Sequence, residues 1–214
     1  MVGIAATEGF MKKMKRILVG LLAVVSVFAS GIGLTACTPT DSSSSSTSSS
    51  TSVAPKGVVY EIGNDGEAQV VDYDGTETSV TIEATYEGVA VTKIAARAFK
   101  GCTSITQIVI PDSVTEIGAS AFEDCSGFTQ FVIPNSVTIV GNNAFMNCTA
   151  LTNVTIGSGV TSIGEGAFDY CTALSSITFN GTKAKWNKID LPNSWLTQVQ
   201  LVTKVTCTDG DVTL

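Results

Sequence analysis

Apolar residues recur along this chain at a fixed interval of 23 positions. Two of the recurring series are Phe99, Phe122, Phe145 and Phe168, and Cys102, Cys125, Cys148 and Cys171. Each interval also holds a short run in which apolar and polar residues alternate, with β-branched residues at many apolar positions. Such alternation predicts one half-buried strand per interval. A unit in the low twenties that is repeated four times predicts a stacked solenoid.

Four copies of the unit follow one another directly, at residues 94–116, 117–139, 140–162 and 163–185. Pro111 and Pro134 end the first two strands, because the fixed φ of proline suits the start of a turn. Glycine at 118, 141 and 164 predicts a tight corner, and the following Ala-Phe pair predicts a 3₁₀ turn or a single helical turn. One unit alone buries too little apolar surface to fold, so the copies must stabilise one another by stacking.

The repeated pattern is similar to that of a known family. It reads x-x-Ile-x-Ile-Pro-x-x-Val-Thr-x-Ile-Gly-x-x-Ala-Phe-x-x-Cys, and over residues 94–180 it resembles the bacterial BspA-like class of leucine-rich repeat. Residues 60–94 resemble the segment that leads into such repeats, and Asn180–Trp186 resemble the usual exit from the last one. The chain departs from the pattern where Gly157 and Asn180 replace the proline that ends the strand.

This resemblance implies a mainly β fold. We expect a right-handed leucine-rich-repeat solenoid with 23-residue repeats, short 3₁₀ or helical turns on its convex side, and β-hairpin caps. The family also implies a surface-exposed or secreted binding scaffold, often linked to adhesion. It supplies no catalytic residues, and we expect the protein not to be an enzyme.

Both ends of the stack need a cap, because exposed strand edges promote aggregation. Residues 58–93 are predicted to form an N-terminal hairpin about Asn64-Asp65-Gly66, followed by a degenerate first rung at 80–82. Residues 186–214 are predicted to form the C-terminal cap.

The C-terminal cap is expected to contain a short helix and a hairpin. Thr182 can cap the helix, which is predicted to run through Ile189 and to place Trp186 over the last repeat. The hairpin spans Lys204–Leu214 about Asp209-Gly210, and a two-residue turn there pairs Cys207 with Val212 and Val205 with Leu214.

The first 36 residues are predicted to be a targeting segment rather than part of the fold. A basic cluster at 12–16 precedes an apolar run at 17–32, which is shorter than the roughly 20 residues of a membrane span. The run ends in Leu34-Thr35-Ala36-Cys37, which resembles the lipobox of bacterial lipoproteins and predicts a lipid on Cys37. The alternative is an ordinary secretory signal that is cut at a nearby small residue. We expect Met11 rather than Met1 to be the initiator.

Residues 37–57 follow as a lipid-bearing cysteine and a linker rich in Ser and Thr, which cannot form a core. The protein is therefore expected to lie outside the cytoplasm, anchored by lipid to a bacterial membrane and exposed at the surface. Only the anchor is expected to contact the membrane.

Charge narrows the choice of partners. The chain carries a formal charge of −7, and residues 1–36 contribute three net positive charges, so the remainder carries −10. This balance argues against binding of nucleic acid or of an anionic membrane through the folded part.

The sequence contains no histidine, and we expect no metal and no cofactor. The acidic series Asp72-x-Asp74 and Glu83 imitates a calcium loop, but the glycine that such a loop requires is misplaced. The four periodic cysteines are interpreted as an interior row of small apolar groups, because side chains that point in parallel have poor geometry for disulfides. Disulfide formation in an exported protein is the alternative.

The outward positions of the four predicted strands, which we call the strand face, form rows without a charged residue. These candidate binding residues are Thr106, Gln107, Val109, Thr129, Gln130, Val132, Thr152, Asn153, Thr155, Ser175, Ser176 and Thr178. We interpret the strand face as the recognition surface, for a host or cell-surface protein that a monomer of this chain binds. The alternative for the face is a merely solvated surface that is rich in Thr because Thr favours strands. The alternatives for the protein are an envelope spacer without a specific ligand, and a row of threonines that orders water.

Overall fold

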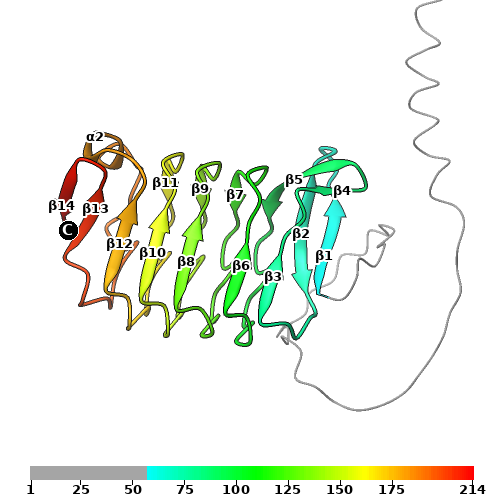
Figure 1. Ribbon diagram of the computed structural model, residues 1–214, viewed down its shortest axis with the longest axis horizontal. Helices are drawn as coiled ribbons and strands as arrows, with labels where there is room; N and C mark the ends of the chain where they lie inside the picture. The colour runs from blue at the N-terminus through cyan, green and yellow to red at the C-terminus, as the bar shows by residue number, and fades with distance from the viewer. Residues whose placement is uncertain (1–56) are drawn as a thin grey trace, which may run out of the picture. The chain divides into compact units, whose positions relative to one another are not determined.

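The computed structural model describes residues 57–214, which form a β-solenoid with rungs about 23 residues apart and almost no helix (Figure 1). The predicted signal peptide, Cys37 and most of the Ser/Thr-rich linker lie outside the described residues. The elements, in chain order, are β1 (Val58–Ile62), β2 (Ala68–Tyr73), β3 (Ser79–Thr81), β4 (Thr85–Tyr86), β5 (Val89–Ile94), β6 (Gln107–Val109), β7 (Glu116–Ile117), β8 (Gln130–Ile133), β9 (Ile139–Val140), β10 (Asn153–Ile156), β11 (Ser162–Ile163), β12 (Ser176–Phe179), α2 (Lys183–Trp186), β13 (Lys204–Cys207) and β14 (Gly210–Thr213).

The strands lie on two sides of the stack. One side is a sheet in the order β1-β2-β5-β7-β9-β11, with β4 paired to β5. The other side carries the strand face and consists of a pair, β3-β6, and a separate sheet, β14-β13-β12-β10-β8. Between repeats the strands are parallel and each residue pairs with its counterpart 23 positions away, as in Asn153 with Ser176. The predicted repeat boundaries therefore correspond to physical rungs.

Threonine hydroxyls reinforce this stacking on the side opposite the strand face. The Oγ1 atoms of Thr115, Thr138 and Thr161 each donate a hydrogen bond to the carbonyl oxygen of the threonine one rung earlier, at 3.1–3.2 Å. The Thr of the repeated Val-Thr motif thus links rungs.

The four periodic phenylalanines form a stack through the centre of the core. All four are fully buried, and successive ring centroids are 5.1, 5.3 and 5.1 Å apart, with interplanar angles of 11°, 11° and 2°. Tyr73 extends the stack at the N-terminal end, and Trp195 closes it edge-on at the other end. The phenylalanine series therefore marks the axis along which the rungs bury each other.

Single turns connect the strands on the convex side. They are closed by bonds of the 3₁₀ type, from residue i+3 to residue i, such as Cys102 N to Phe99 O at 3.1 Å. The glycines at 118, 141 and 164 lie at the corner as predicted, because each accepts the bond that closes a turn, such as Ala121 N to Gly118 O at 3.3 Å. Their φ is not positive. Left-handed residues occur two positions later, at Ser120, Asn143 and Gly166.

Close approach between rungs, rather than a left-handed φ, explains these glycines. A Cβ atom on Gly118 would lie 2.7 Å from Ala96 N, and one on Gly141 would lie 2.6 Å from Ala119 N. A side chain cannot be accommodated at that distance from the backbone of the preceding rung.

The N-terminal cap is confirmed. β1 and β2 are antiparallel, with Tyr60 opposite Val70, and residues 64–66 form the loop between Gly63 and Glu67, whose N–H and carbonyl groups are bonded at 2.8 Å. β3 pairs in parallel with β6, as expected for a degenerate first rung.

The C-terminal cap differs from the prediction in two respects. Thr182 caps the helix by accepting a hydrogen bond from Lys185 N at 3.3 Å, and Trp186 packs against Phe179, but α2 ends at Trp186 rather than Ile189. Turn-type bonds complete the segment to Ile189.

The predicted register of the last hairpin is wrong. Val205 pairs with Val212 and Cys207 with Gly210, so the turn consists of Thr208 and Asp209. The Oδ1 atom of Asp209 accepts a hydrogen bond from Lys183 N at 2.7 Å, which holds Asp209 at the tip of the turn. Leu214 consequently lies outside the core and is 48% exposed.

The periodic cysteines form a buried row beside the phenylalanine stack. The Sγ atoms of Cys125, Cys148 and Cys171 each donate to the carbonyl oxygen of the phenylalanine in the preceding rung, at 2.9–3.2 Å. These three are free thiols, as is Cys207. Cys102 is also fully buried, at the N-terminal end of this row.

Candidate interaction face

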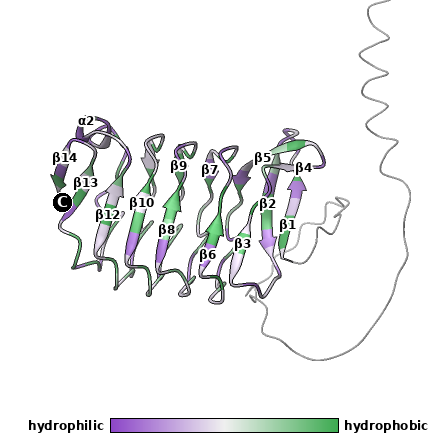
Figure 2. Ribbon diagram, viewed as in Figure 1, coloured by the Kyte–Doolittle hydropathy of each residue, from purple (hydrophilic) through white to green (hydrophobic). Residues whose placement is uncertain are grey.

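The structure brings the twelve predicted residues together on β6, β8, β10 and β12 and on the residues that precede each strand. Nine of them are exposed, and Thr152, Thr155 and Thr178 are half-buried. Figure 2 shows that β8 and β10 begin hydrophilic and become more hydrophobic toward their C-terminal ends. On the strand face itself, the carboxamides lie beside two exposed valines, Val109 and Val132, and beside threonines at the equivalent positions 155 and 178.

Part of the predicted face supports the fold instead of facing a ligand. The hydroxyl of Thr106 donates to Thr78 O at 3.0 Å, that of Thr152 to Thr129 O at 2.8 Å, and that of Ser175 to Thr152 O at 3.3 Å. These three hydroxyls therefore link rungs, and the carboxamides of Gln107, Gln130 and Asn153 are the main polar groups left for recognition.

The sheet of the strand face is interrupted between β6 and β8. On the N-terminal side, Thr106 N and Gln107 N donate to Thr78 O at 2.8 and 3.1 Å, and on the C-terminal side Thr152 N and Asn153 N donate to Thr129 O at 2.8 and 3.3 Å. No corresponding bond joins Thr129 or Gln130 to Thr106 within residues 57–214, and β6 and β8 belong to different sheets. Figure 1 shows the wider spacing of these two strands.

The interruption is confined to this side of the stack. On the opposite side, β7 and β9 of the same two repeats pair in register, with Ile117 opposite Val140. The convex turns are also continuous, since Phe99 N donates to Ala121 O at 2.8 Å. The two rungs are thus joined on two sides and open on the third.

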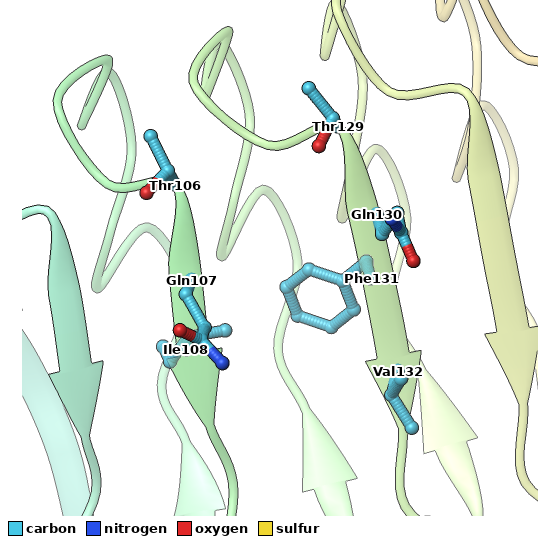
Figure 3. A pocket seen from close by; sticks show the side chains of 7 residues that line it. All are labelled: Thr106, Gln107, Ile108, Thr129, Gln130, Phe131 and Val132. Carbon is cyan, nitrogen blue, oxygen red and sulfur yellow. The ribbon is translucent and has the colours of Figure 1, made fainter.

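A hollow of about 440 Å³ occupies the opening (Figure 3). Its lining consists of Thr106, Gln107, Ile108, Thr129, Gln130, Phe131 and Val132. No lining residue carries a charge. Ile108 is half-buried, whereas its counterparts in the next three rungs, Phe131, Val154 and Ile177, are buried.

Side-chain volume explains why the sheet opens here. The second repeat places aromatic rings at two of the three inward positions of its strand segment, Phe128 and Phe131, where the other repeats have Ile, Leu or Val. The Phe131 ring packs at 4.5 Å from that of Phe145 and at 5.0 Å from that of Phe122. Because a close-packed interior cannot absorb extra volume without a backbone shift, the two rings separate β8 from β6.

Among the described residues, no group of three or more His, Cys, Asp or Glu side chains is arranged so that it could hold a metal ion. Asp72, the first acidic residue of the series that resembles a calcium loop, lies within β2. The Oδ1 atom of Asp72 accepts a hydrogen bond from Tyr73 N at 2.8 Å. Within residues 57–214, no helix has the length and apolar character needed to cross a membrane.

Comparison with known proteins assigns the family. The model of the BspA type leucine rich repeat region, in six copies, matches residues 81–208, which is more than half of the chain. The chain therefore belongs to the BspA-type leucine-rich repeat family. Leucine-rich repeat proteins typically mediate protein–protein interaction, and the scaffold is generally non-enzymatic.

Solved structures agree with this assignment. The chain is 29% identical to a leucine-rich repeat protein from Bacteroides capillosus, with a TM-score of 0.55 over 62% of this chain and 100% of that one. It is 22% identical to a leucine-rich repeat protein from Eubacterium ventriosum, with a TM-score of 0.50 over 71% of this chain and 41% of that one.

A leucine rich cell surface protein from Faecalibacterium prausnitzii is 30% identical, with a TM-score of 0.48 over 62% of this chain. The chain spans 43% of that protein's length. No curated protein matches the chain.

Proposed function

We propose that this protein is a lipid-anchored scaffold at a bacterial cell surface that binds another protein, in adhesion or a related contact, through its strand face. The observation that carries the proposal is the exposed and uncharged row of Gln107, Gln130 and Asn153 beside exposed Val109 and Val132, at 49% and 61%. Protein interfaces deplete charge at their centre and combine apolar area with a few hydrogen-bonding groups.

The anchor is proposed from the sequence. The basic cluster, the short apolar run and Leu34-Thr35-Ala36-Cys37 support export and lipid attachment at Cys37, followed by a Ser/Thr-rich linker to residue 57. Metabolic labelling with an alkyne fatty acid tests this directly. The full chain is expected to take up label, and Cys37→Ala is expected to lose it. Equal labelling of Cys37→Ala would overturn the anchor.

Photo-crosslinking on intact cells tests the binding face. A photoreactive amino acid replaces Asn153 in one full-length variant and Ile139, which is 44% exposed on the opposite side, in the control. A crosslinked protein partner is expected from position 153 and not from position 139. Equal products from both positions, or none from position 153 in the presence of partner cells, would contradict recognition by the strand face.

Introducing positive charge into the carboxamide row gives a second test of this face. The triple variant Gln107→Lys, Gln130→Lys, Asn153→Lys is expected to abolish capture of the crosslinked partner while leaving the thermal unfolding temperature unchanged. Unchanged capture would show that the strand face is not the binding site.

A further inference from the structure

The interruption between β6 and β8 leaves backbone hydrogen-bonding groups directed at the hollow. Asn153 N donates to Thr129 O, so the backbone groups of Thr129 face β10. Alternate residues of a strand direct their N–H and carbonyl groups to opposite neighbours, so those of Gln130 and Val132 face β6. By the same alternation, Ile108 directs its groups toward β8, because Gln107 N donates to Thr78 O on the other side.

These groups include both donors and acceptors. Every other pair of neighbouring strands on this side of the stack, from β3-β6 to β12-β13, satisfies such groups by pairing. Backbone N–H and carbonyl groups require partners, and a ligand that supplies them regains bonds the sheet here lacks.

The hollow has the size and chemistry of a subsite for a small neutral group. Its volume of about 440 Å³ lies within the range of about 300–1,000 Å³ that is usual for ligand sites. The lining includes no charge, and a charged group placed there would lose its hydration without gaining a counter-ion. The uncharged lining therefore favours an uncharged ligand, although the protein as a whole carries a formal charge of −7.

Two further features restrict the ligand. β6 and β8 remain close enough for contact, so a complete strand cannot be inserted between them. The one aromatic lining residue, Phe131, is only 3% exposed, so the hollow has no ring on which a sugar can stack. A carboxamide, by contrast, is a peptide group on a side chain. The oxygen of a Gln or Asn carboxamide accepts hydrogen bonds and its NH₂ group donates them. The aliphatic part of the same side chain can contact Ile108 and Val132.

We propose that the hollow between β6 and β8 binds a carboxamide side chain, of Gln or Asn, from an extended uncharged segment of the partner protein. This inference rests on the proposed function and names the subsite and the partner's chemistry. The carboxamide completes the hydrogen bonding between Ile108 on β6 and Gln130 and Val132 on β8.

Amide chemical shifts of the ¹⁵N-labelled full chain in detergent micelles test the proposal. The probes are acetyl-Thr-Gln-Val-Thr-amide, its isosteric variant with Glu in place of Gln, and maltotriose. The Gln peptide is expected to shift the amide signals of Ile108, Gln130 and Val132 saturably and to leave Asn153 unchanged. The Glu peptide is expected to bind at least tenfold more weakly. No saturable shift, equal binding of the Glu peptide, or a response to maltotriose alone would overturn the proposal.

A matched pair of variants separates the subsite from the face as a whole. Val132→Trp fills the mouth of the hollow from a residue that is 61% exposed, whereas Thr155→Trp places the same ring at the equivalent position of the closed part of the sheet. Val132→Trp is expected to weaken the Gln peptide at least tenfold, and Thr155→Trp to leave it within twofold. Equal effects would overturn the subsite. If the two variants have equal effects but the partner still crosslinks from position 153, only the subsite is wrong and the proposed function stands. If crosslinking from position 153 is also absent, the subsite and the proposed function are both wrong.

Discussion

The Sγ atom of Cys148 donates a hydrogen bond to the carbonyl oxygen of Phe122, 26 residues earlier, at 3.2 Å. The same carbonyl accepts Cys125 N from its own rung, at 3.3 Å. Each such thiol therefore satisfies the second lone pair of a buried carbonyl in the preceding rung. Cysteine is small enough for the row and still supplies a donor, which alanine at that position would not.

Thiol reactivity in the folded protein should reflect this burial. Burial raises the pKa of the Cys125 thiol to about 12, so its reactive thiolate is scarce at neutral pH. We expect Cys125, Cys148 and Cys171 to resist iodoacetamide at pH 8 in the native state and to react within minutes in denaturant. Mass spectrometry of the alkylated peptides measures this. Rapid native labelling of Cys125 would show that the row is accessible.

The same burial predicts a loss of stability at alkaline pH. A hydrogen bond with Cys171, together with burial, raises the pKa of Cys148, and burial raises that of Cys125. In the unfolded chain these thiols ionise near pH 8.5. The unfolded state then binds fewer protons than the native state, so the free energy of unfolding must fall as pH rises above about 8.5.

Urea titrations at pH 8 and at pH 10.5 measure this fall. Cys125→Ala is expected to reduce the pH dependence, because one of the responsible thiols is removed. An identical slope in the parent protein and in Cys125→Ala would contradict the assignment to the cysteine row.

The glycine of the repeat tests the close approach between rungs. Gly141→Ala places a Cβ atom 2.6 Å from Ala119 N, so the rungs must move apart. We expect a loss of about 1–3 kcal/mol in the free energy of unfolding, the usual cost of overpacking. Ala119→Ser, at an exposed neighbouring position, is the control and should change stability by less than about 0.5 kcal/mol. Equal stability of Gly141→Ala and the parent would mean that the rungs are not in contact there.

The phenylalanine stack should dominate the stability of the core. Phe145 is fully buried between two parallel rings, and Phe145→Ala is expected to cost about 3–5 kcal/mol. Tyr170→Ala removes an aromatic ring that is 46% exposed and should cost much less. Chemical denaturation of both variants gives the comparison, and similar costs for the two would refute a central stack.

The repeat itself was predictable from sequence because each rung repeats the same physical requirement at the same position. Phe145 and Cys148 recur in register because each packs on its own counterpart in the next rung. The family and the strand positions follow from that regularity, whereas the N-terminal hairpin follows from the turn residues Asn64-Asp65-Gly66. The left-handed positions were not predictable, because Arg97, Ser120, Asn143 and Gly166 share a φ of 56–66° but no side-chain chemistry.

The candidate site was only partly predictable. Alternation of apolar and polar residues identifies the outward positions, but it does not distinguish Ile108 from Phe131, since both point inward. The signal for the opening was the volume of Phe128 and Phe131 in one repeat, which matters only when that rung is packed against its neighbours. The register of the last hairpin was missed for a similar reason, because the contact from Lys183 N to Asp209 depends on the tertiary fold.

Amide hydrogen exchange tests the central claim, a stack of paired rungs with one opening on its strand face. Thr129 N and Gln130 N occupy the same repeat positions as Thr152 N and Asn153 N, which donate to Thr129 O. We predict that the amide hydrogens of Thr152 and Asn153 exchange at least about 100-fold more slowly than those of Thr129 and Gln130. Equal protection of the two pairs would show that β6 and β8 are joined like the other rungs and would contradict the account.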